Sequence, residues 1–162
     1  ERAYYFEHYS DHVDAQNERN EMARHPERNR TIDDVLKNNK TCPEETVLQL
    51  GNIDETVSAD VLAKVVAEYF EEFNKRYGSH VHILDWALHM DESTPHIHER
   101  HVFDAKNQYG ELCPQQEKAL ENLKVLLYFL PPDEIERHPL STYWIVKGVN
   151  LAEQLALQNR PP

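Results

Sequence analysis

The stretch HMDESTPHIH, residues 89–98, decides the fold that we expect for this chain. The segments before it (80–88) and after its turn (97–103) are rich in β-forming side chains. The residues between these segments are typical of a turn, and Pro95 fixes how the chain enters the second segment. The pattern therefore predicts a β-hairpin with histidines near its tip.

The hairpin would bring three histidines together. Alternate side chains of a strand share a face, so His96 and His98 point the same way, and His89 ends the opposite strand. A histidine pair with one residue between is common by chance, and a lone histidine on a strand is usually a polar surface residue. The third histidine across the turn, with Glu92 three positions after it, favours a divalent-metal site.

The pattern His-x-Asp-Glu-x-Thr-Pro-His-x-His resembles the metal-binding motif of the plasmid mobilisation and recombination (Mob/Pre) relaxases, within the histidine-hydrophobe-histidine nickases. The resemblance covers residues 2–118, and the hairpin is its only specific part. It implies a divalent ion, Mn²⁺ or Mg²⁺ with Zn²⁺ as an alternative, held by His89, His96 and His98. It also implies nicking and strand transfer of single-stranded DNA at a transfer origin, with Glu92 helping to activate the nucleophile.

The family nucleophile is replaced at its expected position. Residues 16–19, Gln-Asn-Glu-Arg, resemble the family signature His-Asn-x-Arg, whose first residue is the proposed nucleophile. An amide cannot form a phosphoramidate bond, so Gln16 removes the expected chemistry there. His12 and His25 are nearby substitutes outside the motif, and we take His25 as the candidate. Arg19 is the position most like a family phosphate contact, and a solvated surface arginine is the equal alternative.

The most basic part of the chain lies at residues 25–41, where arginines and lysines are interspersed with asparagines. Arg28 and Arg30 in this segment are the best candidates for contact with a nucleic-acid strand. The resemblance adds an Asn-rich second motif, which residues 32–33 and 38–39 match loosely. An ordinary surface loop is the alternative.

The composition is that of one soluble globular domain. The 162 residues are 40% hydrophobic and 28% charged, and no apolar run approaches the ~20 residues of a membrane span. Cys42 and Cys113 form no C-x-x-C pair and no signal peptide is visible, so we expect a cytoplasmic protein with reduced thiols. The net charge of −12 argues against a nucleic-acid partner, unless the acidic excess lies on faces away from it.

Further regular elements are expected along the chain. The aromatic residues 2–9 predict a first strand, residues 11–24 a polar helix and residues 46–50 a short strand. A helix is expected at 114–123, and Ser58 opens an amphipathic helix that runs to Tyr77. The core-facing stripe of that amphipathic helix consists of Leu62, Val65, Val66, Tyr69, Phe70, Phe73 and Tyr77.

We therefore predict an α+β fold with an antiparallel sheet of four to five strands and helices packed on one face, as the resemblance to relaxases implies. Residues 1–124 would form the metal-binding domain, and residues 125–162 a helical extension packed on it. The hairpin is expected beside the first strand, where Gln16, Arg19 and His25 can approach the ion.

Three other functions stay open at this stage. A relaxase-derived DNA-binding module would keep the metal and the fold without cleavage, as Gln16 would allow. A metal-dependent phosphodiester hydrolase would use water as the attacking group and would fit an acidic surface better. A structural zinc site would have a closed fourth position, filled by Asp91 or Glu92.

Overall fold

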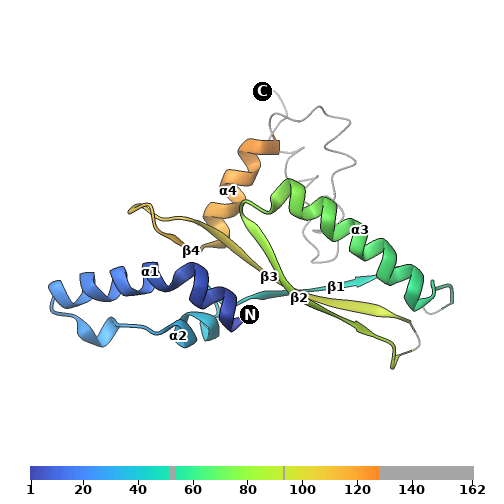
Figure 1. Ribbon diagram of the computed structural model, residues 1–162, viewed down its shortest axis with the longest axis horizontal. Helices are drawn as coiled ribbons and strands as arrows, with labels where there is room; N and C mark the ends of the chain where they lie inside the picture. Colours follow the sequence, from blue (N-terminus) through green and yellow to red (C-terminus); the bar gives the residue numbers. More distant parts are fainter. Residues whose placement is uncertain (52–53, 93, 128–162) are drawn as a thin grey trace, which may run out of the picture.

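A four-stranded antiparallel sheet, built around one long strand, forms the centre of the molecule (Figure 1). The computed structural model describes residues 1–51, 54–92 and 94–127. Helices pack against the sheet, and the fold is α+β, as predicted. In chain order the elements are α1 (Arg2–Met22), η1 (Pro26–Arg28), α2 (Ile32–Lys37), β1 (Glu44–Gln49), α3 (Ala59–Tyr77), β2 (Val81–His89), β3 (His96–Lys106), β4 (Leu112–Pro114) and α4 (Gln116–Leu127).

The strand β3 organises the sheet because it pairs with every other strand in the described part of the chain. β1 and β2 lie antiparallel on its two sides, and β4 pairs with its last residues, from Asp104 onward. The predicted hairpin between segments 80–88 and 97–103 is confirmed as β2 and β3. β3 continues to Lys106, three residues beyond the expected segment 97–103.

Helices cover both faces of the sheet, whereas the sequence predicted them on one face. Val102 and Phe103 are neighbours in β3, so their side chains lie on opposite faces. The buried cluster around Phe103 joins β3 to α3 and α4, and the cluster around Val102 joins β3 to α1 and α2. The first consists of Phe73, Tyr77, Val81, Phe103, Ala105, Ala119 and Leu123, and the second of Tyr5, Tyr9, Val13, Ile32, Val35 and Val102.

Residues 2–9 form the start of the helix α1, so the predicted first strand is wrong. Their aromatic side chains favour a strand by propensity. However, Tyr5, Tyr9 and Val13 recur every four residues and therefore share one face of a helix. That face is buried against the sheet, and burial decides the conformation. The predicted helix at 11–24 is the continuation of the same element, which ends at Met22.

Two tyrosine hydroxyls fix α1 to the rest of the molecule. The Tyr5 hydroxyl donates to the Thr41 carbonyl at 2.6 Å, and the Tyr9 hydroxyl donates to the Asp104 carboxylate at 3.0 Å. Burial, together with the charge of Asp104, raises the pKa of Tyr9 far above its ordinary value, so this hydroxyl stays protonated and donates. The other oxygen of Asp104 lies 3.0 Å from Nε2 of His82, so the fully buried carboxylate has a partner on each side.

The predicted helix from Ser58 to Tyr77 is confirmed as α3. The Ser58 hydroxyl accepts a hydrogen bond from the Val61 backbone N–H, and Gly78 follows the last turn. Val65, with 43% of its surface exposed, is the one member of the predicted stripe that faces solvent. The buried members are Leu62, Val66, Phe73 and Tyr77.

The helix α4 begins at Gln116 rather than at Pro114, because Pro114 closes β4. It reaches Leu127. The rest of the expected helical extension, residues 128–162, lies outside the described residues. None of the helices described is both long enough and apolar enough to cross a membrane.

The packing of α3 gives a stability prediction. We expect Phe73→Ala to lower the free energy of unfolding by about 3–5 kcal/mol, because it empties the contact between α3 and β3. Val65→Ala is the matched control on the exposed side of the same helix, and it should change stability by less than about 0.5 kcal/mol. Urea unfolding followed by circular dichroism measures both, and equal losses would contradict this orientation of α3.

Candidate metal centre

Three histidine side chains converge at the end of the β2–β3 hairpin, as predicted. One ring nitrogen from each of His89, His96 and His98 lies within 4.8 Å of the other two. The ring centroids are 4.5 Å apart for His89 and His98, 5.1 Å for His96 and His98, and 5.3 Å for His89 and His96. Among the residues that the structure describes, this is the one group of three or more side chains that could share a metal ion.

Strand pairing explains why these side chains meet. His89 lies directly opposite His96 in the register, and His98 lies two positions further along β3, opposite Ala87. Positions two apart on a strand share a face, and opposite positions place their Cβ atoms about 5 Å apart. The side chain of Ala87 is only a methyl group, so it leaves room for the His98 ring opposite it. The register of the hairpin thus brings three imidazoles together on one face.

Two of the histidines have hydrogen-bonding partners that select the tautomer. Nδ1 of His96 lies 3.1 Å from the Thr94 carbonyl, and Nδ1 of His98 lies 2.7 Å from Oε1 of Glu45. Both partners are acceptors, so each Nδ1 carries the proton and each Nε2 keeps its lone pair. A metal-ligating histidine usually donates its other N–H to a carbonyl or carboxylate in this way. The hydrogen-bonding pattern therefore fits metal ligands.

Glu45 links the histidine group to a neighbouring arginine. The hydrogen bond from His98 holds the pKa of Glu45 below its ordinary value, and the charge of Arg100 adds to this effect. Arg100 donates to Glu45 at 3.4 Å and to Glu1 at 2.9 Å. Glu45 therefore stays ionised and remains an acceptor for the imidazole.

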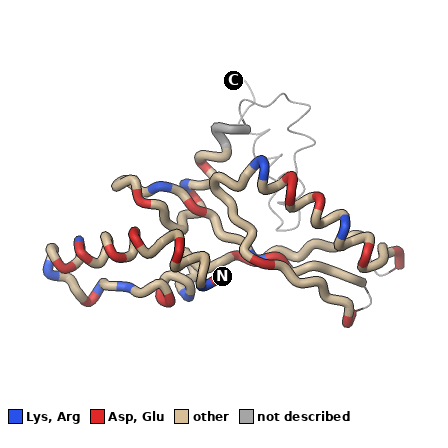
Figure 2. The backbone as a smooth tube through the Cα atoms, in the orientation of Figure 1, with Lys and Arg blue, Asp and Glu red and all other residues tan. Residues whose placement is uncertain are grey.

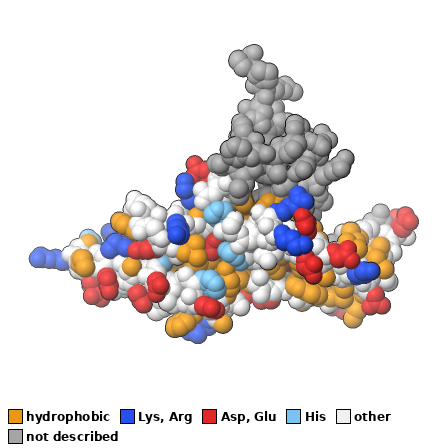
Figure 3. Space-filling view, turned by 45° about the horizontal axis from the view of Figure 1, so that its top comes forward, with side chains coloured by type: hydrophobic (Ala, Val, Ile, Leu, Met, Phe, Trp, Pro, Cys, Tyr) orange, Lys and Arg blue, Asp and Glu red, His pale blue; other side chains and the backbone are white. Residues whose placement is uncertain are grey.

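The surface around the three histidines is accessible. His96 is buried, whereas the His98 side chain is 33% exposed. Val47, opposite His98 in β1, and Met90, after His89, are exposed hydrophobic residues. Figure 3 shows hydrophobic side chains gathered at the end of the molecule that carries the hairpin tip. A substrate could therefore reach this group from solvent.

The donor set fits a divalent transition metal. Three histidines with a fourth position left open are typical of catalytic zinc sites. Imidazole nitrogen suits Zn²⁺ better than Mg²⁺, which prefers oxygen ligands in an octahedral arrangement. The all-nitrogen set at His89, His96 and His98 therefore favours Zn²⁺ over Mg²⁺, although the resemblance implies Mn²⁺ or Mg²⁺.

Glu92 and Asp91 lie exposed in the turn between β2 and β3. Neither carboxylate belongs to the convergent group, which consists of the three histidines. A closed structural zinc site with one of them as the fourth ligand therefore has no support in this arrangement. Glu92 remains the candidate proton acceptor by its position beside the histidines in the sequence.

The other residues expected at the ion lie elsewhere. Figure 1 shows the C-terminal end of α1 and the hairpin tip at opposite ends of the molecule. Arg19 is held by the turn that follows β3, at residues 107–111. The nine positions from His98 to that turn span roughly 30 Å of strand. The expected approach of Gln16, Arg19 and His25 to the ion is therefore wrong, because α1 carries them away from the tip.

Arg19 has a carboxylate partner of its own. Its guanidinium donates to both oxygens of Glu111, at 2.5 and 2.8 Å, and lies 4.2 Å from the Tyr109 ring centroid. The hydrogen bonds from Arg19, and then those from Asn107 and His12, hold the pKa of Glu111 well below its ordinary value. These contacts favour a structural role for Arg19 over a phosphate contact.

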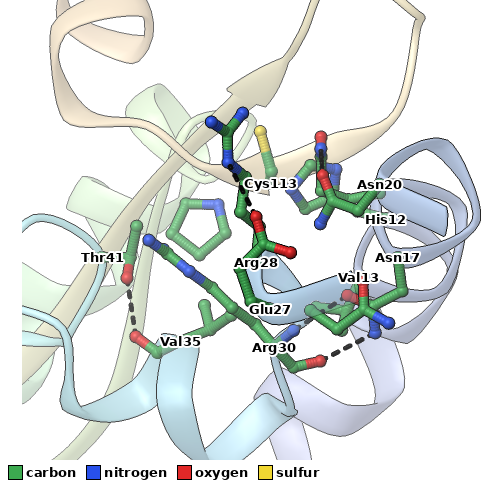
Figure 4. Close-up of a pocket in the computed structure, with 13 residues that line it drawn as sticks. His12, Val13, Asn17, Asn20, Glu27, Arg28, Arg30, Val35, Thr41 and Cys113 are labelled. Atoms are coloured by element: carbon green, nitrogen blue, oxygen red, sulfur yellow. Dashed lines mark hydrogen bonds and ion pairs between the residues drawn. The ribbon is translucent and has the colours of Figure 1, made fainter. Parts of the chain in front are cut away.

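His25, Arg28 and Arg30 lie beyond the end of α1. His25 is exposed, with Nδ1 2.9 Å from Glu27. Arg28 and Arg30 line a pocket beside α1 (Figure 4), and their contact with nucleic acid stays a prediction. Figure 2 shows acidic residues along both α1 and α3.

Sequence reasoning missed Glu45 and the Thr94 carbonyl as partners of the histidines. Glu45 is 53 positions from His98 in sequence, and only the pairing of β1 with β3 places it nearby. The alternation of β1 could have shown which of its side chains share a face, but not its register. Thr94 is two residues from His96, so the turn sequence carried a local signal.

Comparisons with protein-family models, with curated proteins and with solved structures find no match for this chain. The likeness to relaxases therefore rests on the residues of the hairpin motif.

The metal assignment can be tested with two substitutions. The double variant His96→Ala, His98→Ala should lose binding of Zn²⁺ and Mn²⁺ while keeping the fold, because it removes two of the three ligands. His8→Ala is the matched control, since His8 is an exposed histidine of α1. Calorimetric titration and circular dichroism measure both properties. Stoichiometric metal in the double variant would rule out this site.

The role of Glu45 can be tested separately. Glu45→Gln should weaken Zn²⁺ binding about 10–100-fold, because the His98 imidazole loses the carboxylate that orients it. Glu68→Gln removes the same charge from an exposed position of α3 and should leave the affinity unchanged. If both variants bind Zn²⁺ with equal affinity, Glu45 does not support the metal site, and its ion pair with Arg100 is the role that remains.

Proposed function

We propose that this chain binds a divalent metal ion through His89, His96 and His98 and acts in relaxase-like cleavage or strand transfer of single-stranded DNA. The observation that carries the proposal is the convergence of the three imidazoles beside an exposed surface. The hydrogen bonds from His96 and His98 to acceptors support it further. The likeness of the hairpin motif to the Mob/Pre relaxases supports DNA as the substrate, and with it a cytoplasmic role in plasmid or conjugative-element mobilisation.

In this proposal each part of the hairpin has a distinct role. The ion, when bound, supplies positive charge that stabilises the charge developing on the scissile phosphate. The three histidines hold the ion, and Glu45 and the Thr94 carbonyl keep two of the rings in orientation. Glu92, exposed in the turn, accepts the proton of the attacking group.

The attacking group separates this proposal from a second candidate function. Gln16 and His25 lie with the far end of α1, away from the three histidines. This placement favours water over a histidine of that region as the attacking group. Metal-dependent hydrolysis of a phosphodiester, which releases free ends, is therefore the second candidate. Binding of DNA without cleavage is the remaining outcome.

A cleavage assay tests the proposal. A labelled single-stranded oligonucleotide with a candidate transfer origin is incubated with Mn²⁺, Zn²⁺ or Mg²⁺ and run on a denaturing gel that reveals protein adducts. We expect metal-dependent cleavage that is lost in His96→Ala and kept in His8→Ala. A covalent adduct supports strand transfer, and free ends alone support hydrolysis. Intact DNA in the presence of bound metal would overturn both catalytic versions.

A further inference from the structure

A pocket of about 620 Å³ opens beside the second half of α1, away from the three histidines (Figure 4). Its walls come from α1, from η1 and the residues after it, from α2 and from β4. Pro114 of this pocket lies opposite Asp104 in the sheet, six positions along β3 from His98, or roughly 20 Å. The volume is in the range of pockets that hold small organic ligands. This pocket is therefore separate from the metal centre.

Two arginines line the pocket from the segment after α1. The Asn17 side chain clamps the backbone of Arg30: Oδ1 accepts from its N–H at 2.9 Å, and Nδ2 donates to its carbonyl at 2.8 Å. These two hydrogen bonds fix the position of the Arg30 backbone, and therefore of its Cβ atom. Among the residues described, the Arg30 guanidinium forms no ion pair within 4.0 Å and has the Asp34 carboxylate as its electrostatic neighbour, and the Arg28 guanidinium has only Glu27, at 4.0 Å. Two positively charged side chains thus line the pocket with most of their donors free.

The inner wall is neutral and partly apolar. Asn20 is nine-tenths buried, and its Oδ1 accepts from Gln16 at 3.2 Å. The side-chain hydrogen bond of Asn20 found among the described residues is the one that its Oδ1 accepts, so Nδ2 can donate to a ligand in the pocket that Asn20 lines. Val13 and Val35 are buried residues that add apolar surface. The wall therefore suits a flat organic group that carries hydrogen-bond acceptors.

The turn that forms this pocket has an unusual backbone. Arg24 has φ = 62°, the left-handed conformation, which is costly for a residue other than glycine. The turn is closed by a hydrogen bond of 2.8 Å from the His25 N–H to the Asn20 carbonyl. It returns the chain along α1 so that η1 and Arg30 face the helix. Glu27 also lines the pocket, and His25 occupies its Oε1 at 2.9 Å.

We propose that this pocket binds one nucleotide, with the phosphate on Arg28 and Arg30 and the base against Asn20, Val13 and Val35. Guanidinium groups suit phosphate because they can offer two parallel N–H donors. A phosphate ion alone would leave most of the 620 Å³ unfilled, whereas a nucleotide occupies more of it and brings its base to the Asn20 amide. The nucleotide is either free or one unit of a single strand. If the nucleotide is one unit of a single strand, the pocket is a further contact for the DNA substrate, and this version rests on the proposed function.

The test is a binding titration in the presence of a chelator, so that the metal centre does not contribute. The probes are the four deoxynucleoside 5′-monophosphates, the matching nucleosides, inorganic phosphate and a fluorescent single-stranded oligonucleotide. We expect a monophosphate to bind more tightly than its nucleoside or phosphate. Arg28→Ala and Arg30→Ala should each weaken binding about tenfold or more, and Arg30→Lys should also weaken it, because lysine keeps the charge without the paired donors.

Two controls separate this proposal from general charge effects and from the metal centre. Lys64→Ala removes one positive charge from an exposed position of α3 and should leave binding unchanged. His96→Ala should also leave it unchanged, although it abolishes cleavage. Tighter binding of the oligonucleotide than of monophosphates supports a strand contact, and the reverse supports a free nucleotide.

Two results would overturn the proposal. One is the absence of binding for every nucleotide probe, and the other is equal loss in Arg30→Ala and Lys64→Ala. Metal-dependent cleavage that persists unchanged in the Arg28 and Arg30 variants, without nucleotide binding, would reject the pocket and keep the proposed function. Nucleotide binding without any metal-dependent cleavage would support the pocket and reject the catalytic versions of the proposed function.

Discussion

The antiparallel pairing of β2 with β3 is the constraint on which the rest of the structure depends. Opposite positions fix His89 against His96, and the two-residue period then places His98 on the same face. A slip of one residue would move His96 and His98 to the face covered by α3, and would expose Ile97. The buried side chains that hold this register also keep the three imidazoles together. The core and the candidate metal centre thus share one determinant.

The same strand carries charged side chains into the interior, and each has a specific arrangement. Asp104 is fully buried between the Tyr9 hydroxyl and His82, and Glu99 lies 3.1 Å from Nδ1 of His101 on the other face. Burying a charge is costly unless it is paired. Two of the 29 acidic residues, Glu99 and Asp104, therefore lie inside the fold rather than on a surface.

How much of the fold could be predicted depended on the signal at each element. The hairpin and α3 were predictable because turn residues and a clear 3.6-residue period mark them. The strand predicted for residues 2–9 was wrong because the β-forming propensity of the aromatic residues was given more weight than the four-residue spacing of Tyr5, Tyr9 and Val13. The partners of the histidines could not be predicted in full, because the register that places Glu45 beside His98 joins distant segments. The position of Arg19 depended on the direction of α1, which the sequence does not encode locally.

The placement of α1 divides one face of the sheet into a covered part and an open part. Its first turn meets the sheet at Arg100, which contacts Glu1, and its tyrosines cover the face from Val102 to Asp104. His96 and His98 lie on the same face just before this covered part, since positions two apart share a face. The pocket beside α1 lies beyond it, roughly 20 Å from the metal centre along β3. A small phosphoester can occupy only one of these sites at a time. A single strand of nucleic acid is long enough to reach both proposed sites, so under the two proposals binding there would become coupled only for a polymeric ligand.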